Sequence, residues 1–393
     1  MDKKNLLLIV PKLDQGGLER VCVRTARILA PWFHITIAAF DPSHPAYDLE
    51  GLDVRNLHAP AAPGRVGKVL RVLQRAQRLR RLKKELQTDI AYSFGPTANR
   101  ANVAAGGRGE IWCGLRSSAD LEKERELRLI AKKADRLICC SKVLAEEVEK
   151  KCGIQKSWVL YNPFQTDKLE EQAKASDTGL PDWEGKKMLI ALGREDRSKG
   201  FWHLLKAFSL IHKKLPDTRL AIVGAGSFEK YKQLAQELGI ADVVCMPGLK
   251  KNPFPWLKRA DLYVAMSVYE GFPNALVEAM SLGTPVISSN CMTGPAEILT
   301  EDYAKTLQAE EILEGEYGVL IPAVNPKEDF DANHITAREK LFAEEVQRLL
   351  TDPGKLSHYA LQAKRRAQKF SEEAYIEQFL KIAGNETGKA EEE

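Results

Sequence analysis

The sequence has no apolar run of the roughly 18 residues that a transmembrane helix needs. It opens with only a short apolar run at 6–10, and no small-residue cleavage site follows that run. We therefore interpret it as a first β-strand and not as a signal peptide. These absences predict a cytoplasmic protein that does not span the membrane.

Cysteine motifs and the common nucleotide signatures are missing as well. The seven cysteines show no C-x-x-C or other metal spacing, so we expect free, mostly buried thiols. No G-x4-G-K-[S/T] loop occurs. Gly224-Ala225-Gly226 begins like a dinucleotide fingerprint, but Glu229 stands where the third glycine belongs, which argues against a nicotinamide site.

Net charge is also small, at +4, but it is unevenly distributed. Residues 1–163 contain 29 Lys or Arg and 18 Asp or Glu, which gives +11, and the remainder contains 29 and 36, which gives −7. The basic character of the chain therefore belongs to its N-terminal part.

Short apolar segments alternate with helical patterns throughout, which predicts parallel, doubly wound α/β sheets. The expected strands lie near 6–10, 34–40, 54–57, 90–94, 111–115, 137–140 and 158–161, and then near 188–192, 219–223, 243–246, 262–266, 286–289 and 319–321. A polar stretch separates the two sets. We therefore expect two Rossmann-like domains facing across a cleft: 1–163, a hinge or linker at 164–185, then 186–370, with a C-terminal helix and tail at 371–393.

The most informative stretch is 267–282, which follows the predicted strand at 262–266. Gly271 suits a tight turn, and Pro273 with Asn274 suits the start of a helix. Glu270 and Glu278 are about two helical turns apart, so both can border one site at the end of the strand. A helix N-terminus attracts phosphate, and carboxylates accept hydrogen bonds from sugar hydroxyls. Together these groups suit a nucleotide sugar, although solvated surface charges would be the simpler interpretation of an isolated pair.

The run E-G-F-P-N-A-L-V-E-A-M from Glu270, followed by G-T-P-V-I-S from Gly283, resembles the signature of retaining GT-B glycosyltransferases of family four, the group 1 glycosyltransferases. Gly193-Arg194 with Lys199-Gly200, and Gly16-Gly17-Leu18-Glu19-Arg20, resemble further motifs of that family. The resemblance implies a GT-B fold and a metal-independent, hexosyltransferase-type enzyme that needs no cofactor. Consistently, no Asp-x-Asp ends a predicted strand.

The resemblance also implies roles. Arg194 and Lys199 hold the leaving diphosphate, Glu278 binds the ribose, and Glu270 binds the donor sugar, with Glu270, Arg194 and Lys199 as the catalytic set. Fixed cations there would stabilise charge that develops in the transition state. The remaining expected donor contacts are glycines, helix-start residues and loop residues: Gly16, Gly17, Gly193, Gly224, Pro247, Gly271, Phe272, Pro273, Asn274, Ala275 and Leu276. The donor is expected to be a UDP-, GDP- or ADP-sugar.

The acceptor side is less defined. Many members of the family place a histidine near the segment Ser93-Phe94-Gly95-Pro96, and this chain has none there. Asn99, Arg100 and Arg116 are the polar residues that we expect to face the acceptor. Cys291 has no histidine nearby in the sequence, so we do not expect it to be a nucleophile.

The segment 65–86 holds nine Lys or Arg, one acidic residue and an apolar stripe at helical spacing. Packing of the stripe on the domain's own sheet is its default explanation. The cations suit an anionic membrane surface, and we expect five of them to face it: Arg78, Arg80, Arg81, Lys83 and Lys84. Nucleic acid is the competing partner, but the segment offers no aromatic residue to stack on bases.

Together these features predict a retaining glycosyltransferase that acts on a lipid-linked glycan in surface polysaccharide assembly, at the inner face of the cell membrane. A nucleotide-sugar 2-epimerase of the same fold, which needs no acceptor, is one alternative. A basic nucleic-acid-binding protein is the other.

Overall fold

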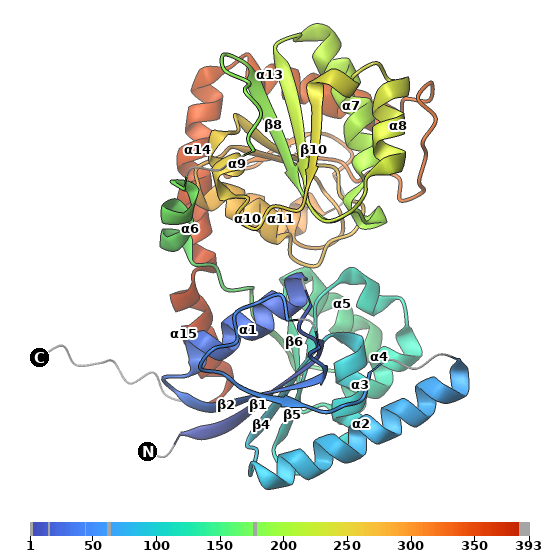
Figure 1. Ribbon diagram of the computed structural model, residues 1–393, viewed down its shortest axis with the longest axis vertical. Helices are drawn as coiled ribbons and strands as arrows, with labels where there is room; N and C mark the ends of the chain where they lie inside the picture. The colour runs from blue at the N-terminus through green and yellow to red at the C-terminus, as the bar shows by residue number, and fades with distance from the viewer. Residues whose placement is uncertain are drawn as a thin grey trace, which may run out of the picture. The chain divides into compact units, whose positions relative to one another are not determined.

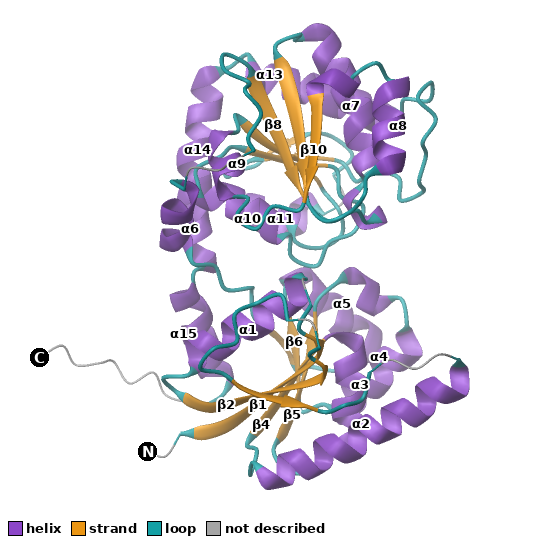
Figure 2. Ribbon diagram, viewed as in Figure 1, coloured by secondary structure: helices purple, strands orange, loops and turns teal. Residues whose placement is uncertain are grey.

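The computed structural model describes residues 3–14, 16–43, 45–60, 64–175, 179–307 and 309–384. The chain forms two compact units (Figure 1). Unit 1 is Met1–Pro163 with Glu372–Glu393, and unit 2 is Phe164–Ser371. In both units helices lie on the two faces of a mostly parallel sheet (Figure 2). No helix in the described ranges is long and apolar enough to cross a bilayer.

The sheet of unit 1 has seven parallel strands in the order β3-β2-β1-β4-β5-β6-β7. The strands are β1 (Lys4–Lys12), β2 (Phe33–Asp41), β3 (Asp53–Asn56), β4 (Ile90–Phe94), β5 (Glu110–Leu115), β6 (Arg136–Cys139) and β7 (Ser157–Val159). The central strand β1 buries its side chains on both faces, as a strand covered by helices on each side must.

The helices of unit 1 are α1 (Gly17–Leu29), α2 (Arg65–Glu85), α3 (Gly95–Ala105), α4 (Glu124–Lys133), α5 (Lys142–Cys152) and α15 (Glu372–Ile382), with a 3-10 turn at Ser118–Leu121. Leu6 and Leu8 belong to one core cluster, and Leu7 and Ile9 belong to the other. This alternation follows from the two-residue period of a strand. Each face of the sheet therefore has its own hydrophobic core.

The last helix, α15, completes the first of these cores although it is remote in sequence. Phe379 lies 5.6 Å from Phe33 and 5.3 Å from Trp112, measured between ring centroids. The hydroxyl groups of Tyr375 and Thr25 are 2.8 Å apart and hydrogen-bonded. Unit 1 is thus discontinuous, because the end of the chain packs on its beginning.

The sheet of unit 2 runs in the order β10-β9-β8-β11-β12-β14-β13, and only β13 is antiparallel to its neighbour. Its strands are β8 (Lys187–Leu192), β9 (Thr218–Val223), β10 (Val244–Gly248), β11 (Leu262–Ala265), β12 (Val286–Ser289), β13 (Leu313–Glu314) and β14 (Val319–Ile321). Its helices are α6 (Thr166–Ala173), α7 (Phe201–Lys214), α8 (Glu229–Glu237), α9 (Phe254–Arg259), α10 (Asn274–Ser281), α11 (Pro295–Leu299), α12 (Tyr303–Thr306), α13 (Ala337–Leu350) and α14 (Pro353–Ala367), with 3-10 turns at Arg197–Lys199, Ala241–Val243 and Gln368–Phe370.

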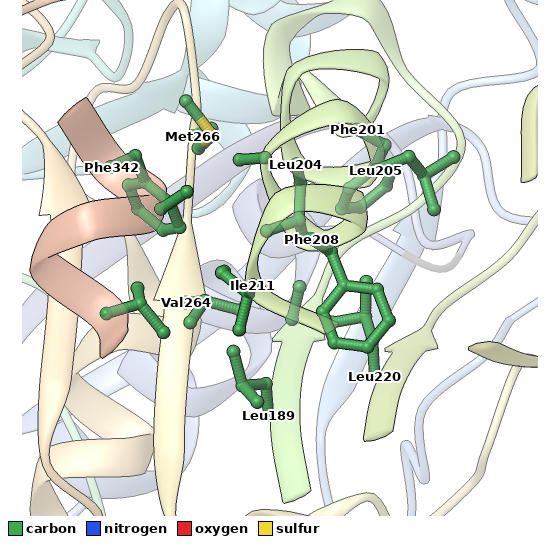
Figure 3. Packing of buried hydrophobic residues seen from close by; sticks show 14 of the residues in the cluster. Leu189, Phe201, Leu204, Leu205, Phe208, Ile211, Leu220, Val264, Met266 and Phe342 are labelled. Carbon is green, nitrogen blue, oxygen red and sulfur yellow. The ribbon is translucent and has the colours of Figure 1, made fainter. Parts of the chain in front are cut away.

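The core of unit 2 lies where α7 and α13 cover the sheet (Figure 3). Phe208 and Ile211 from α7 pack against Leu189 and Val264 from the strands, and Phe342 from α13 closes the cluster. This packing holds the strand ends in fixed register, so the loops that follow them have defined positions.

The predicted linker at 164–185 differs from what the structure shows. Residues Thr166–Ala173 form helix α6, which buries Leu169 and packs against α9 within unit 2. The segment is rich in Lys, Glu and Asp, so its composition indicated a linker. A short amphipathic helix needs only a few apolar residues to pack on its domain, and these were too few to give a clear pattern.

Candidate functional site

The candidate site lies at one edge of the unit 2 sheet. Strands β8, β9, β11 and β12 are parallel to their neighbours, so their carboxyl ends all point to this edge. Ligands of open α/β sheets collect at such edges, in the loops that follow the strands. The predicted donor residues of this unit lie in these loops, in helix α10, which follows the loop after β11, and in strand β10.

The loop after β8 carries the two predicted donor cations, Arg194 and Lys199. Arg194 is exposed and forms a 3.3 Å ion pair with Asp196. Asp196 in turn caps the 3-10 turn Arg197–Lys199 by accepting a 2.8 Å hydrogen bond from the Ser198 N–H. Burial alone would raise the pKa of Asp196, but its hydrogen bonds with Ser198 and the charges of Arg194 and Lys199 outweigh it and hold that pKa below its usual value. Asp196 is therefore an anchor for the cationic loop.

Lys199 and Glu270 form the central contact of the site. Lys199 Nζ lies 2.6 Å from Glu270 Oε1, and both side chains are largely buried. Ser267 Oγ donates a 2.8 Å hydrogen bond to the same carboxylate oxygen. The backbone adds a further link, because the Val268 N–H donates to the Ser198 carbonyl at 2.8 Å. The structure thus brings together the two sequence motifs that lie 71 residues apart.

Two glycines permit this close approach. A Cβ on Gly224 would lie 1.7 Å from the Gly193 carbonyl oxygen, so the loops after β8 and β9 meet backbone to backbone. Gly200 has a φ of +59°, and a Cβ there would lie 2.1 Å from the Met266 carbonyl oxygen. Any side chain at either position would push the loops apart.

The loop after β11 carries the predicted donor motif. The Thr293 hydroxyl donates to the Glu270 carbonyl, and a Cβ on Gly294 would lie 2.5 Å from Pro273 Cδ. Pro273 is the N-cap of α10, and Asn274 and Ala275 lie in its first turn. Gly271 and Phe272 are buried.

Glu278 lies inside α10 and is buried. Burial raises the pKa of Tyr263, and the charges of Glu270 and Glu278 raise it further, so both carboxylates act on one phenol. The charges of both glutamates thus reach Tyr263, and their roles at one donor site stay a prediction. Leu276 differs: its side chain is in the core and its N–H donates to the Pro273 carbonyl, so it offers nothing to a ligand. Leu276 is buried because it lies on the apolar face of α10.

The remaining predicted donor positions fall on two elements. Pro247 is half-buried in β10, and the carbonyl of the next residue, Gly248, accepts from the Gly224 N–H at 3.1 Å. Gly16 and Gly17 begin α1 in unit 1.

Sequence reasoning missed Tyr47, which fixes the Gly16 backbone. The Gly16 N–H donates to the Tyr47 hydroxyl at 3.0 Å, and that hydroxyl donates to the Gly16 carbonyl at 2.6 Å. Burial raises the pKa of Tyr47, although its bond to Gly16 and the Arg20 charge oppose the shift. Tyr47 lies in an irregular loop after β2, where no sequence signal marks it.

Glu195 and His203 were also missed. Glu195 accepts a 2.9 Å hydrogen bond from the Phe228 N–H and so orders the loop after β9. His203 is buried on α7, where its ring lies 2.5 Å from Glu339 and 2.9 Å from the Asn325 carbonyl. The next carbonyl along that loop, Pro326, accepts from Arg197 at 2.9 Å. In the sequence, only its place next to Arg194 could have indicated a role for Glu195. No sequence feature indicated a role for His203.

The three predicted acceptor residues have different surroundings. Asn99 is fully buried and bonded to Ser93 and to the Gly114 carbonyl at 2.7 and 2.8 Å, so its expected role in a binding surface is wrong. It sits on the face of α3 that packs on the sheet. Arg100 pairs with Glu126 at 3.0 Å.

Arg116, at the end of β5, donates to Asn162 at 2.9 Å and to the Tyr92 hydroxyl. Its guanidinium lies 5.2 Å from the Phe94 ring centroid. Although burial opposes it, the tyrosines and cysteines around Arg116 raise its pKa, so the group keeps its charge. A role for Arg116 at the acceptor stays a prediction.

Two of the five predicted membrane-facing cations form hydrogen bonds within unit 1. Lys83 is 0% exposed and donates to the Gly106 carbonyl at 3.0 Å, so its prediction is wrong. It falls on the same face of α2 as Ala76 and Leu79, which pack on the core. Arg78 is half-buried and donates to the Leu57 and His58 carbonyls. The other three, Arg80, Arg81 and Lys84, are exposed.

Cys291 does not resemble a catalytic thiol. It is buried, and burial together with the nearby Glu270 charge raises the pKa of its thiol. The thiolate, which is the nucleophilic form, is therefore disfavoured.

Family models match both units of the chain. Residues 177–370 match the model described as glycosyl transferases group 1, and residues 15–168 match the model described as glycosyltransferase family 4. The chain therefore belongs to the group 1 glycosyltransferases, as the Glu270 motif predicted.

Two relatives illustrate the range of the family. An uncharacterized glycosyltransferase of Methanocaldococcus jannaschii is 29% identical over 233 residues, which are 57% of this chain and 56% of that protein. The N-acetylgalactosamine-N,N'-diacetylbacillosaminyl-diphospho-undecaprenol 4-alpha-N-acetylgalactosaminyltransferase of Campylobacter jejuni is 24% identical over 247 residues, 62% of this chain and 58% of that protein. The matched part thus spans less than two thirds of each relative.

The fold is shared with solved glycosyltransferases. HepE of Anabaena, crystallised with UDP and glucose, superposes with a TM-score of 0.75 at 19% identity, covering 97% of this chain and 99% of that one. The predicted GT-B fold is confirmed.

Proposed function

We propose that this glycosyltransferase moves a sugar from a nucleotide-diphosphate donor to an acceptor with retention of anomeric configuration. The observation that carries the proposal is the Lys199–Glu270 pair, which joins a cationic loop to a carboxylate loop at the ends of adjacent strands. A nucleotide sugar has an anionic and a hydroxyl-rich part, and this arrangement presents a complementary group to each. HepE, which has the same fold, was solved with UDP and glucose.

Arg194 and Lys199 take the diphosphate in this proposal. Arg194 is held by Asp196 at 3.3 Å, and Lys199 is held by Glu270 at 2.6 Å. When the sugar–phosphate bond breaks, negative charge grows on the departing phosphate oxygens. Cations that are already positioned stabilise this charge without reorganisation, which lowers the barrier. The diphosphate charge is thereby balanced by side chains, and the reaction proceeds without a metal ion.

The two glutamates divide the remaining recognition. Glu278 accepts hydrogen bonds from the ribose, and Glu270 from the donor sugar. Glu270 is bonded to Lys199 and Ser267, which stabilises its charge and makes it a poor nucleophile. A covalent glycosyl intermediate on Glu270 is therefore disfavoured. We propose that the nucleoside diphosphate leaves, and the acceptor attacks, on the same face of the sugar.

The acceptor is proposed to be a lipid-linked glycan in surface polysaccharide assembly, bound by unit 1 at the inner face of the cell membrane. The name of the Campylobacter jejuni relative includes a diphospho-undecaprenol acceptor. The part of the chain that forms most of unit 1 carries +11, which suits an anionic surface. Arg116 is half-buried, and we propose that it binds an acceptor phosphate.

The test is a donor screen. The chain is incubated with UDP-, GDP- and ADP-sugars, with and without a polyprenyl-diphosphate-linked glycan, and release of nucleoside diphosphate is measured. We expect one donor class to react in an acceptor-dependent way, and NMR of the product to show the donor's anomeric configuration. Inversion would refute the retaining mechanism. A new free nucleotide sugar formed without acceptor would instead identify a 2-epimerase.

A further inference from the structure

We infer that the outward face of α2 is a membrane-insertion surface, formed by an apolar tip of Val69, Leu70 and Leu73 and a cationic patch of Arg80, Arg81 and Lys84. The inference rests on the proposed function, because a lipid-linked acceptor would bring the protein close to a membrane. Its physical content is a specific contact with an anionic bilayer.

Exposure defines the tip. Val69, Leu70 and Leu73 are 61%, 62% and 60% exposed, whereas Leu79 farther along the same helix is fully buried. Three large apolar side chains in two successive turns are thus open to water. Scattered apolar residues on a surface need no explanation, but a contiguous group of them marks an interaction site. In Figure 1 these turns extend past α3, the helix on which α2 packs.

Helical spacing places the tip and the patch on one face. Positions 69, 73, 77, 80 and 84 follow one another at intervals of three or four residues, which aligns them along a helix. The outward face is therefore apolar from Val69 to Leu73 and basic from Arg80 to Lys84. Gln77 lies between the two parts.

The inward face has its own cations, and these are committed to the fold. Arg75 donates to the Ala59 carbonyl at 2.9 Å and lies 4.3 Å from the Phe40 ring centroid, and Lys83 bonds Gly106. The outward cations have no such structural task among the described bonds. Some cations of α2 thus stabilise the fold of unit 1, and the others face outward.

The patch continues onto the neighbouring loop. A Cβ on Gly107 would lie 3.5 Å from Arg80 Cγ, so this loop contacts the outward end of α2. The next residue, Arg108, is exposed and adds a fourth cation.

An anionic bilayer satisfies both halves of this face. Lipid headgroups attract the cations, and the acyl boundary takes up the apolar side chains, as in interfacial amphipathic helices. Nucleic acid would use the cations and leave the apolar tip in water. No aromatic residue lies on α2 to stack on bases. The tip therefore favours the bilayer.

The test is co-sedimentation with vesicles of phosphatidylglycerol and phosphatidylcholine, and with vesicles of phosphatidylcholine alone. Wild type is expected to bind the anionic vesicles. Leu70→Gln with Leu73→Gln should reduce binding at least tenfold although no charge changes. Arg80→Gln with Arg81→Gln and Lys84→Gln should reduce it by about fivefold for each cation removed.

Matched controls come from unit 2. Leu361→Gln removes an equally exposed leucine from α14, and the triple change of Lys213, Lys214 and Lys340 to Gln removes three exposed cations from α7 and α13. Both controls should bind vesicles as wild type does. Calorimetry with UDP, GDP and ADP on every variant measures nucleotide binding at the donor site. A failure of the proposed function is therefore distinguishable from a failure of the membrane inference.

Three outcomes would overturn the inference. One is unchanged vesicle binding in the Leu70/Leu73 variant, which would mean that charge alone acts. Another is tight, salt-sensitive binding of an oligonucleotide together with no vesicle binding. The third is a dimer in solution that the Leu70/Leu73 variant dissociates, which would make the tip an interface between two copies.

Discussion

Phe272 and Phe370 pack edge to face, with ring centroids 5.2 Å apart. The ring centroid of Phe164 lies 6.4 Å from that of Phe272. The two partners are the residues near which the chain enters and leaves unit 2, and the Phe164 N–H donates to the Phe370 carbonyl at 3.0 Å. The loop that carries Glu270 is thus packed directly against both junctions.

Replacing Phe272 tests this packing. Phe272→Ala removes a buried ring and is expected to lower the unfolding free energy of unit 2 by about 3 kcal/mol. Turnover should fall as well, because Glu270 is two residues away. Chemical denaturation and donor turnover measure the two effects. Phe272→Leu, which keeps most of the volume, should lose less of both. A stable, fully active Phe272→Ala variant would contradict this account.

The cationic loop offers a prediction with an internal control. Arg194→Ala and Lys199→Ala should each lower kcat roughly 100- to 1000-fold, because each removes a positive charge that we propose to lie beside the departing diphosphate. Arg197 lies between them, is exposed and bonds the Pro326 carbonyl, so Arg197→Ala should change kcat little. Steady-state kinetics of the three variants decide the point, and equal losses in all three would show a general effect of charge.

Substitutions of the two glutamates are expected to have different effects, one on nucleotide binding and the other on sugar transfer. Glu278→Gln should weaken binding of the bare nucleoside diphosphate, since it removes a ribose acceptor. Glu270→Gln should leave that binding nearly unchanged and impair transfer. Isothermal titration calorimetry measures the first quantity and product formation the second. Glu229→Gln, an exposed acidic residue of α8, serves as the control. Equal loss of affinity in the two active-site variants would disprove the division of roles.

Tyr47 is expected to position the loop before α1. Tyr47→Phe keeps the ring but removes both hydrogen bonds to Gly16, which is expected to cost about 1 kcal/mol of stability and about tenfold in transfer. Nucleoside diphosphate affinity should change less than transfer, because the proposed contacts of the nucleotide with Arg194, Lys199 and Glu278 lie in unit 2. Unaltered transfer with the same loss of stability would reduce Tyr47 to a structural residue.

Lys83 gives unit 1 a predictable pH dependence. Burial lowers the pKa of Lys83 to about 8, from 10.5 for a free lysine. Below pH 8 the lysine is protonated in both states and stability does not change. Between pH 8 and 10.5 the unfolded chain binds more protons, so the unfolding free energy rises with pH, by a total on the order of 3 kcal/mol.

The comparison of wild type with Lys83→Met isolates this effect from other titrating groups. Denaturant unfolding at pH 7 and pH 10 should show wild type gaining stability relative to the variant. Lys84→Met, the exposed neighbour, should show no such trend. A constant difference between wild type and Lys83→Met at the two pH values would refute the shift.

The parallel sheets and the donor loops could be predicted because their signals are local. Apolar runs such as 188–192 mark buried strands, and Glu270, Glu278, Arg194 and Lys199 stand in motifs with fixed spacing. The burial of Lys83 and Asn99 could not be predicted, because it depends on which face of a helix meets the sheet. Tyr47 could not be predicted either, since its partner Gly16 comes close only in the folded chain.

The location of α15 has a consequence for synthesis of the chain. Unit 2 is continuous from Phe164 to Ser371, so all of its residues are available before the last helix leaves the ribosome. Unit 1 starts first but lacks Tyr375 and Phe379 until all of unit 2 has been translated. Its nascent sheet therefore exposes the apolar face around Trp112 while unit 2 is made. Chains truncated before residue 372 would retain a foldable second unit and an incomplete, aggregation-prone first one.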